Sequence, residues 1–124
     1  VPPGPPLIGY VSHLLGLRAG QTWRIPVDQF GNPTLADDLA RAAWDGLALA
    51  GVYHAAGSHF CDRYAFALEI ARVFDLNPTQ LEAVDTPSLG QAALRPLCGG
   101  LVSTRLEDAL GWRFHGLTGL ETLL

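Results

Sequence analysis

The stretch DQFGNPTLADDLARAAWDGL, Asp28 to Leu47, joins a turn to a helix and decides the fold class that we expect. Its Gly-Asn-Pro sequence favours a tight turn. Thr34 is of a residue type that caps helices, and the carboxylates of Asp37 and Asp38 suit the first turn as capping, solvated groups. Apolar residues then recur at helical spacing, so the sequence predicts a helix that begins at Leu35 and ends near residues 50–51.

Further elements are expected on both sides of this stretch. The spacing of apolar residues predicts helices at 7–17, 63–74, 105–110 and 116–124, and strands at 22–28, 51–57 and 81–84. The segment GVYHAAG, 51–57, is short, apolar and bounded by glycines, which is typical of a buried strand in a parallel sheet. Helices that alternate with strands indicate the α/β class. So few and such short strands indicate part of a sheet and not a whole one.

Three helix ends carry recognisable cap residues. Asp62 is placed to cap the helix at 63–74. Thr104 and Glu107 have the spacing of a capping box for the helix at 105–110. Gly111 follows that helix, where a left-handed residue commonly ends it.

Composition excludes several classes of protein. The chain has 124 residues, which suits one domain, and 48% of them are hydrophobic, which argues against disorder. The net charge is −4 and no basic run occurs, so we expect no nucleic-acid partner. Charged residues and glycines interrupt every apolar stretch, so we expect no membrane span.

Cysteine and histidine usage indicates neither a metal site nor an oxidising compartment. Cys61 and Cys98 are the only cysteines; they are compatible with one disulfide, but free thiols are favoured. His54 and His59 are poorly spaced to share a metal ion. The start of the chain lacks the pattern of a signal peptide, so a cytoplasmic location is expected. The chain lacks methionine and begins VPPGPPLIGYV, so we expect a piece of a longer protein.

A long irregular segment, TPSLGQAALRPLCGG at 86–100, is the first candidate for ligand binding. Compact domains rarely carry such loops unless the loops bind something. Arg95 lies inside it with no acidic neighbour in sequence, and a guanidinium there could clamp a phosphate through two hydrogen bonds. The alternative is an exposed or purely structural arginine. No Gly-x-Gly-x-x-Gly, P-loop, Gly-x-Ser-x-Gly or His-Glu-x-x-His motif is present.

Several stretches together resemble the C-terminal half of dTDP-4-dehydrorhamnose reductases, which are extended short-chain dehydrogenases related to sugar-nucleotide epimerases. They are DQFGNPTLADDLARA, GVYHAAGSHFCDRYAFALEIARVF, ALRPLCGGLVSTRLEDALG and GLETLL, in the family's order from about Leu7 onward. The resemblance implies the C-terminal portion of a Rossmann-like fold, in which 51–57 is a late sheet strand with flanking helices and the rest forms a small substrate-binding lobe. Residues 1–124 would be this single portion, and the N-terminal NAD(P)-binding portion would be absent.

The resemblance also implies a function for the intact protein, the reduction of the 4-keto group of a dTDP-6-deoxy sugar by NAD(P)H. The family's catalytic Tyr-x-x-x-Lys pair is missing, because the chain contains no lysine. We therefore expect no catalytic residue, no bound cofactor and no activity in this chain alone. It would supply the wall that grips the nucleotide sugar, with Arg95, Gln29, Asn32 and Thr34 as candidate contacts. For Asn32 and Thr34, turn formation and capping are the favoured explanation.

Two other functions stay open at this point. Reductase-like folds also serve as non-catalytic regulatory modules, as in methionine adenosyltransferase, and the chain could instead be an unrelated, self-contained α/β domain. The expected partners are a dTDP-linked sugar, the missing N-terminal half and a second copy of the chain. Self-association is expected because a strand at 51–57 would have uncovered edges and faces.

Overall fold

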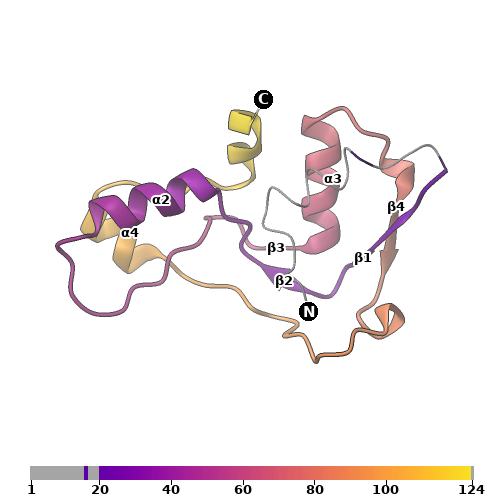
Figure 1. Ribbon diagram of the computed structural model, residues 1–124, viewed down its shortest axis with the longest axis horizontal. Helices are drawn as coiled ribbons and strands as arrows, with labels where there is room; N and C mark the ends of the chain where they lie inside the picture. Colours follow the sequence, from indigo (N-terminus) through magenta and orange to yellow (C-terminus); the bar gives the residue numbers. More distant parts are fainter. Residues whose placement is uncertain (1–15, 17–19, 124) are drawn as a thin grey trace.

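The computed structural model describes residue 16 and residues 20–123, so the helix expected at 7–17 lies outside the described residues. Two groups of elements lie beside each other in Figure 1 and are connected through two short strands, β2 (Phe30–Gly31) and β3 (Cys61–Asp62). One group contains β1 (Trp23–Pro26), β4 (Leu81–Val84) and α3 (Arg63–Val73), and the other contains α2 (Ala36–Asp45) and α4 (Thr104–Leu110). Each group contains its own apolar cluster, and β2 and β3 lie between the two groups.

The first group is a parallel pair of strands covered by a helix. Strand β1, Trp23–Pro26, pairs in parallel with β4, Leu81–Val84, from Trp23 opposite Leu81 to Pro26 opposite Val84. Helix α3, Arg63–Val73, lies between them in sequence and packs on both. The apolar cluster formed here is made of the following buried residues: Ile25, Phe66, Ala67, Ile70, Ala71, Leu81 and Leu120.

The second group packs two short helices around Phe114. Helix α2 spans Ala36–Asp45 and helix α4 spans Thr104–Leu110. Ala42 and Leu106 meet Phe114 in the second buried cluster, against which further side chains pack. The two clusters share no residue.

Short elements connect these groups. Strand β2, Phe30–Gly31, pairs antiparallel with β3, Cys61–Asp62. The 3₁₀ helices are η1 at Pro78–Gln80, η2 at Pro87–Leu89 and η3 at Leu117–Leu123. The helix expected at 116–124 is present as η3, and its type is 3₁₀.

Most element predictions are confirmed among the described residues. The strands expected at 22–28 and 81–84 are β1 and β4, and the helices expected at 63–74 and 105–110 are α3 and α4. Asp62 caps α3 by accepting a hydrogen bond from the backbone N–H of Ala65 at 2.8 Å. Gly111 ends α4 with a φ of 78°, in the left-handed region that glycine adopts without strain.

The strand predicted at 51–57 is wrong, because this segment forms no ladder with another described residue. The side chains nevertheless alternate: Tyr53 and Ala55 pack on the second cluster, whereas Val52 and His54 are exposed. The backbone N–H groups of residues 53–55 donate to no described residue. The expected burial is wrong for Val52 and His54, and no described strand pairs with the segment.

Two predicted helix caps are also wrong. Residue 34 lies one position before the N-cap of α2, which is Leu35, and α2 ends at Asp45, earlier than expected. Ser103 precedes α4, and its hydroxyl bonds the backbone of Ala56 and not its own helix. Glu107 accepts instead from the backbone N–H of Phe114 at 3.0 Å. Thr104 is therefore the first residue of α4 and not its N-cap, which is Ser103.

Candidate functional site

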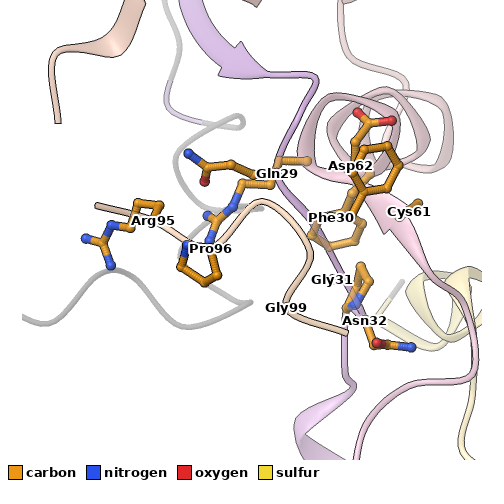
Figure 2. Close-up of a pocket in the computed structure, with 12 residues that line it drawn as sticks. Gln29, Phe30, Gly31, Asn32, Cys61, Asp62, Arg95, Pro96 and Gly99 are labelled. Atoms are coloured by element: carbon orange, nitrogen blue, oxygen red, sulfur yellow. The ribbon is translucent and has the colours of Figure 1, made fainter. Parts of the chain in front are cut away.

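A cavity of about 410 Å³ opens beside β2, at the junction between the two groups. Figure 2 shows residues 29–32 of the β2 segment along one wall, Cys61 and Asp62 beside them, and residues 95–99 across from them. The backbone builds this wall, because Phe30 donates to Leu97 O at 2.8 Å and Gly99 donates to Phe30 O at 3.0 Å. The long loop expected to bind a ligand is thus fastened to the turn that precedes α2.

The structure brings three of the four predicted site residues to this cavity. Gln29, Asn32 and Arg95 line it, whereas Thr34 is not among its lining residues. They come from segments more than sixty positions apart, which are joined only by the folding of the loop onto β2. The four residues differ in what their polar atoms do.

Arg95 is exposed, and its guanidinium makes no hydrogen bond or ion pair with another described residue. In Figure 2 its side chain extends away from Phe30, on the far side of Pro96. A guanidinium has five N–H donors, and none of those of Arg95 bonds to a described residue.

Gln29 is buried, with 5% of its surface exposed, and its amide is already engaged. Its Nε2 donates to Thr86 Oγ1 at 3.1 Å and to Gln91 Oε1 at 2.9 Å. Its backbone carbonyl accepts from the N–H of Arg63, at the start of α3, at 3.1 Å. Gln29 therefore fixes the start of the long loop and the start of α3 against β2.

Asn32 and Thr34 hold a second set of backbone groups. Asn32 Nδ2 donates to Gly57 O at 2.9 Å, and its Oδ1 accepts from the N–H of Leu101 at 2.8 Å. Thr34 Oγ1 donates to Asn32 O and accepts from the N–H of Gly57, both at 2.9 Å. A side chain at position 57 would not fit, because a Cβ there would lie 1.9 Å from Pro33 O. These contacts form the central joint, which we define as Asn32, Thr34 and Gly57.

Asp28 is a site-forming residue that the sequence analysis missed. Its carboxylate accepts from the hydroxyl of Thr86 at 2.6 Å and from the N–H of Thr86 at 3.0 Å. These two bonds, the hydroxyl first, hold the pKa of Asp28 below its ordinary value of 3.8. The partners lie 58 positions apart, so no local pattern could have identified the pair.

A second cavity, also of about 410 Å³, lies on the other side of the central joint. Asn32 and Gly57 border it, together with Phe60 and the segment that leads into α4. The two cavities share Asn32 in their linings. The side chain that fastens the loop therefore also separates the two hollows.

The two cysteines are free thiols that flank β2. Cys61 is paired with Gly31, and Cys98 forms a parallel bridge with Phe30 on the other edge of the strand. Two strand spacings of about 4.8 Å separate them, which exceeds the Cα distance of about 7 Å that a disulfide tolerates. Burial, followed by the charge of Asp62, raises the pKa of the Cys61 thiol.

Asp38 corrects the expectation of a solvated capping group. It is 5% exposed, and its carboxylate accepts from the backbone N–H of His115 at 2.7 Å and lies 2.9 Å from His115 Nδ1. The neighbouring Asp37 is exposed, as expected.

Metal and membrane sites are absent from the part of the chain that the structure describes. No group of three or more His, Cys, Asp or Glu side chains is placed to hold a metal ion there. Within those same residues, no helix has the length and apolar character to span a bilayer.

These features are those of an α/β domain with a hollowed, partly charged surface. Residues 9–116 match the family described as the RmlD substrate binding domain. The chain belongs to that family. The regulatory-module alternative is not favoured by this match.

Two curated proteins resemble the chain. It is 30% identical over 120 residues to a dTDP-4-dehydrorhamnose reductase from Streptomyces griseus, across 90% of this chain and 38% of that protein. It is 33% identical over 102 residues to the spore coat polysaccharide biosynthesis protein SpsK from Bacillus subtilis, across 81% of this chain and 36% of that protein. The chain thus spans less than two fifths of the length of each relative.

A solved structure confirms the fold class. The chain superposes with a TM-score of 0.81 on a dTDP-4-dehydrorhamnose reductase from Bacillus anthracis in complex with NADP. The sequence identity is 24%, and the match covers 92% of this chain and 42% of that one. The expected α/β fold, shared with part of a Rossmann-like reductase, is therefore confirmed.

Proposed function

We propose that residues 1–124 are the substrate-binding portion of an NAD(P)H-dependent reductase that acts on a 4-keto-6-deoxy sugar linked to dTDP. The observation that carries this proposal is Arg95, whose guanidinium lies unengaged by any described residue at a cavity in a member of a substrate-binding family. A diphosphate carries the charge and the oxygen geometry that a guanidinium binds best.

The four candidate residues have two roles in this proposal. Arg95 contacts the diphosphate directly. Gln29, Asn32 and Thr34 position the walls of the cavity, because their polar atoms already bond to protein groups. Because these side chains are already fixed, the loop that contains Arg95 loses less conformational entropy when a ligand binds.

The cofactor and the proton donor belong to the remainder of the longer protein in this proposal. The relative from Bacillus anthracis binds NADP, which supports NAD(P)H as the hydride source of the intact reductase. This chain has no lysine and no glycine-rich phosphate loop, so we expect it to bind no cofactor alone. Its part in the reaction is to hold and orient the sugar nucleotide while hydride is delivered from the other portion.

The nucleotide-binding portion is the proposed partner, and the extended segment at 52–55 is where we expect it to pair. Val52 is 79% exposed, and the backbone N–H groups of residues 53–55 are unused within the described chain. Arg105 holds the segment from the other side, with Nη1 3.2 Å from Val52 O and its guanidinium 4.4 Å from the centroid of the Tyr53 ring. Hydrogen exchange tests this pairing: the amides of residues 53–55 should exchange rapidly in this chain and be protected in the longer polypeptide.

A cytoplasmic location is part of the same proposal. It is supported by the free thiols of Cys61 and Cys98, because a reducing compartment keeps thiols in that state.

Calorimetric or NMR titration with dTDP tests the ligand. Arg95→Ala should weaken binding by about ten-fold or more, since a charge-assisted hydrogen bond contributes roughly 1.5–3 kcal/mol. Arg72→Ala removes the same charge from the end of α3 and does not touch the cavity, so it is the matched control. Binding that is unchanged in Arg95→Ala, or absent from the wild-type chain, would contradict the proposal.

A further inference from the structure

We propose that the ring of Phe30 is the surface on which the thymine base of the nucleotide stacks. The inference rests on the proposed function and adds the base-binding contact to it. Phe30 lies between two residues singled out from the sequence, yet nothing in the sequence distinguished it from a core phenylalanine. Its position in the structure distinguishes it from a core phenylalanine, because it lines the cavity and is partly exposed.

The backbone of Phe30 is held from both edges. It pairs with Asp62 in the antiparallel β2–β3 ladder on one side and bridges Cys98 in parallel on the other. On that second edge its N–H donates to Leu97 O and its carbonyl accepts from Gly99 N–H, at 2.8 and 3.0 Å. A residue held on both edges projects its side chain in a fixed direction, which is what a preorganised binding contact requires.

The ring is supported from behind by a second aromatic ring. Phe60 stacks on Phe30 with the ring centroids 5.6 Å apart and an interplanar angle of 26°. Phe60 is itself fitted against Gly100, where an added Cβ would lie 2.5 Å from its ring. The contact with Phe60 uses one face of the Phe30 ring, and we place the base on the opposite face.

Phe30 nevertheless stays 39% exposed, and it lines the cavity that contains Arg95. Figure 2 shows the ring on one side of Pro96 and the Arg95 side chain on the other, directed away from the ring. A nucleoside diphosphate has a flat apolar base at one end and a charged diphosphate at the other. An extended nucleotide would place its base on the ring and its diphosphate at the guanidinium.

The test compares a ligand that has the base with one that lacks it. NMR titrations of the 124-residue chain with dTDP and with inorganic pyrophosphate give both affinities. Phe30→Leu keeps an apolar side chain but removes the π face, and Phe30→Tyr keeps the ring as the matched control. Base stacking predicts that Phe30→Leu weakens dTDP binding about ten-fold or more, because stacking on an aromatic side chain commonly contributes that much. Pyrophosphate binding should not change, and Phe30→Tyr should bind dTDP like the wild type.

A spectroscopic signature separates stacking from a structural role. The ring current of Phe30 should shift the thymine H6 and methyl signals upfield in the wild type and in Phe30→Tyr, and not in Phe30→Leu. Equal loss of dTDP and pyrophosphate binding in Phe30→Leu, or wild-type binding of dTDP no tighter than of pyrophosphate, would overturn the stacking inference and leave the anion site standing. Failure of the wild type to bind either ligand would overturn both proposals.

Discussion

The carboxylate of Asp38 accepts two hydrogen bonds from His115, one from its backbone N–H at 2.7 Å and one with the ring Nδ1 at 2.9 Å. The two residues are 77 positions apart, and the contact ties the first turn of α2 to the segment before η3. Asp38 is buried, whereas the imidazole of His115 is half exposed. Asp38 lies in the first turn of α2, where the helix dipole stabilises its negative charge.

Replacing Asp38 should therefore destabilise the fold more than replacing its neighbour. Asp38→Ala leaves the N–H of His115 without its acceptor, and we expect the free energy of unfolding to fall by about 2 kcal/mol. Asp37→Ala, in the same turn but exposed, is the control and should change it by about 0.5 kcal/mol or less. Urea titration followed by circular dichroism measures both. Equal effects would show that Asp38 acts only through the helix dipole.

Mutation should distinguish the two hydrogen bonds of the Asn32 amide, one donated by Nδ2 and one accepted by Oδ1. Asn32→Asp keeps an oxygen for the N–H of Leu101 but loses the donor to Gly57 O, whereas Asn32→Ala loses both bonds. Amide hydrogen exchange should therefore be faster at Leu101 in Asn32→Ala and close to wild type in Asn32→Asp. Rapid exchange at Leu101 in the wild-type chain would contradict this assignment.

Gly57, in the central joint, should tolerate an added side chain less well than the other described glycines. The Cβ of Gly57→Ala would meet Pro33 O at 1.9 Å and His115 O at 3.1 Å, both of them backbone atoms. We expect the free energy of unfolding to fall by about 3 kcal/mol. Gly31→Ala provides the control, because no atom lies within 4 Å of a Cβ there. Comparable urea midpoints for the two variants would disprove this difference.

The free energy of unfolding should depend on pH through the carboxylate of Asp28. Because hydrogen bonds from Thr86 lower its pKa in the folded chain, the stabilisation is complete above about pH 4 and is lost as the pH falls through the folded-state pKa. Asp85, whose pKa is lowered by Ser88, acts in the same window and with the same sign. Thr86→Val removes the hydroxyl, so the fall in melting temperature between about pH 5 and pH 2.5 should be smaller than in the wild type. Thr79→Val is the control, since Thr79 bonds Asn77 and no carboxylate.

The isolated chain should self-associate through the surface near 44–52. Trp44, Leu47 and Val52 are 76%, 74% and 79% exposed. Apolar side chains this exposed favour association when their partner is missing. Sedimentation velocity should show a concentration-dependent increase in mass that Trp44→Glu reduces. Leu68→Glu, on α3 and only 37% exposed in the wild type, is the control. A monomer at every concentration would contradict the prediction.

Features that depend on neighbouring residues could be predicted from the sequence. The capping of α3 by Asp62 needs only a residue three positions on, and Gly111 needs only its own backbone freedom. The strand at 81–84 was predicted with the bounds that the structure gives. Local propensity and apolar spacing decide such elements, so the sequence contains the whole signal.

Features that depend on distant partners could not be predicted. Thr34 has the residue type of a cap, but a stronger set of partners, Asn32 O and Gly57 N–H, takes its hydroxyl. The site residues were chosen by residue type and resemblance, and the sequence could not reveal which of their polar atoms are already bonded. The strand predicted at 51–57 is wrong for a related reason, because a ladder needs a second strand and no described residue pairs with this segment.

The central joint is held by hydrogen bonds to backbone groups, and the two apolar clusters share no side chain. A change of volume inside one cluster therefore needs no compensating change in the other. Substitutions in different clusters should therefore change the free energy of unfolding additively, because no side chain belongs to both.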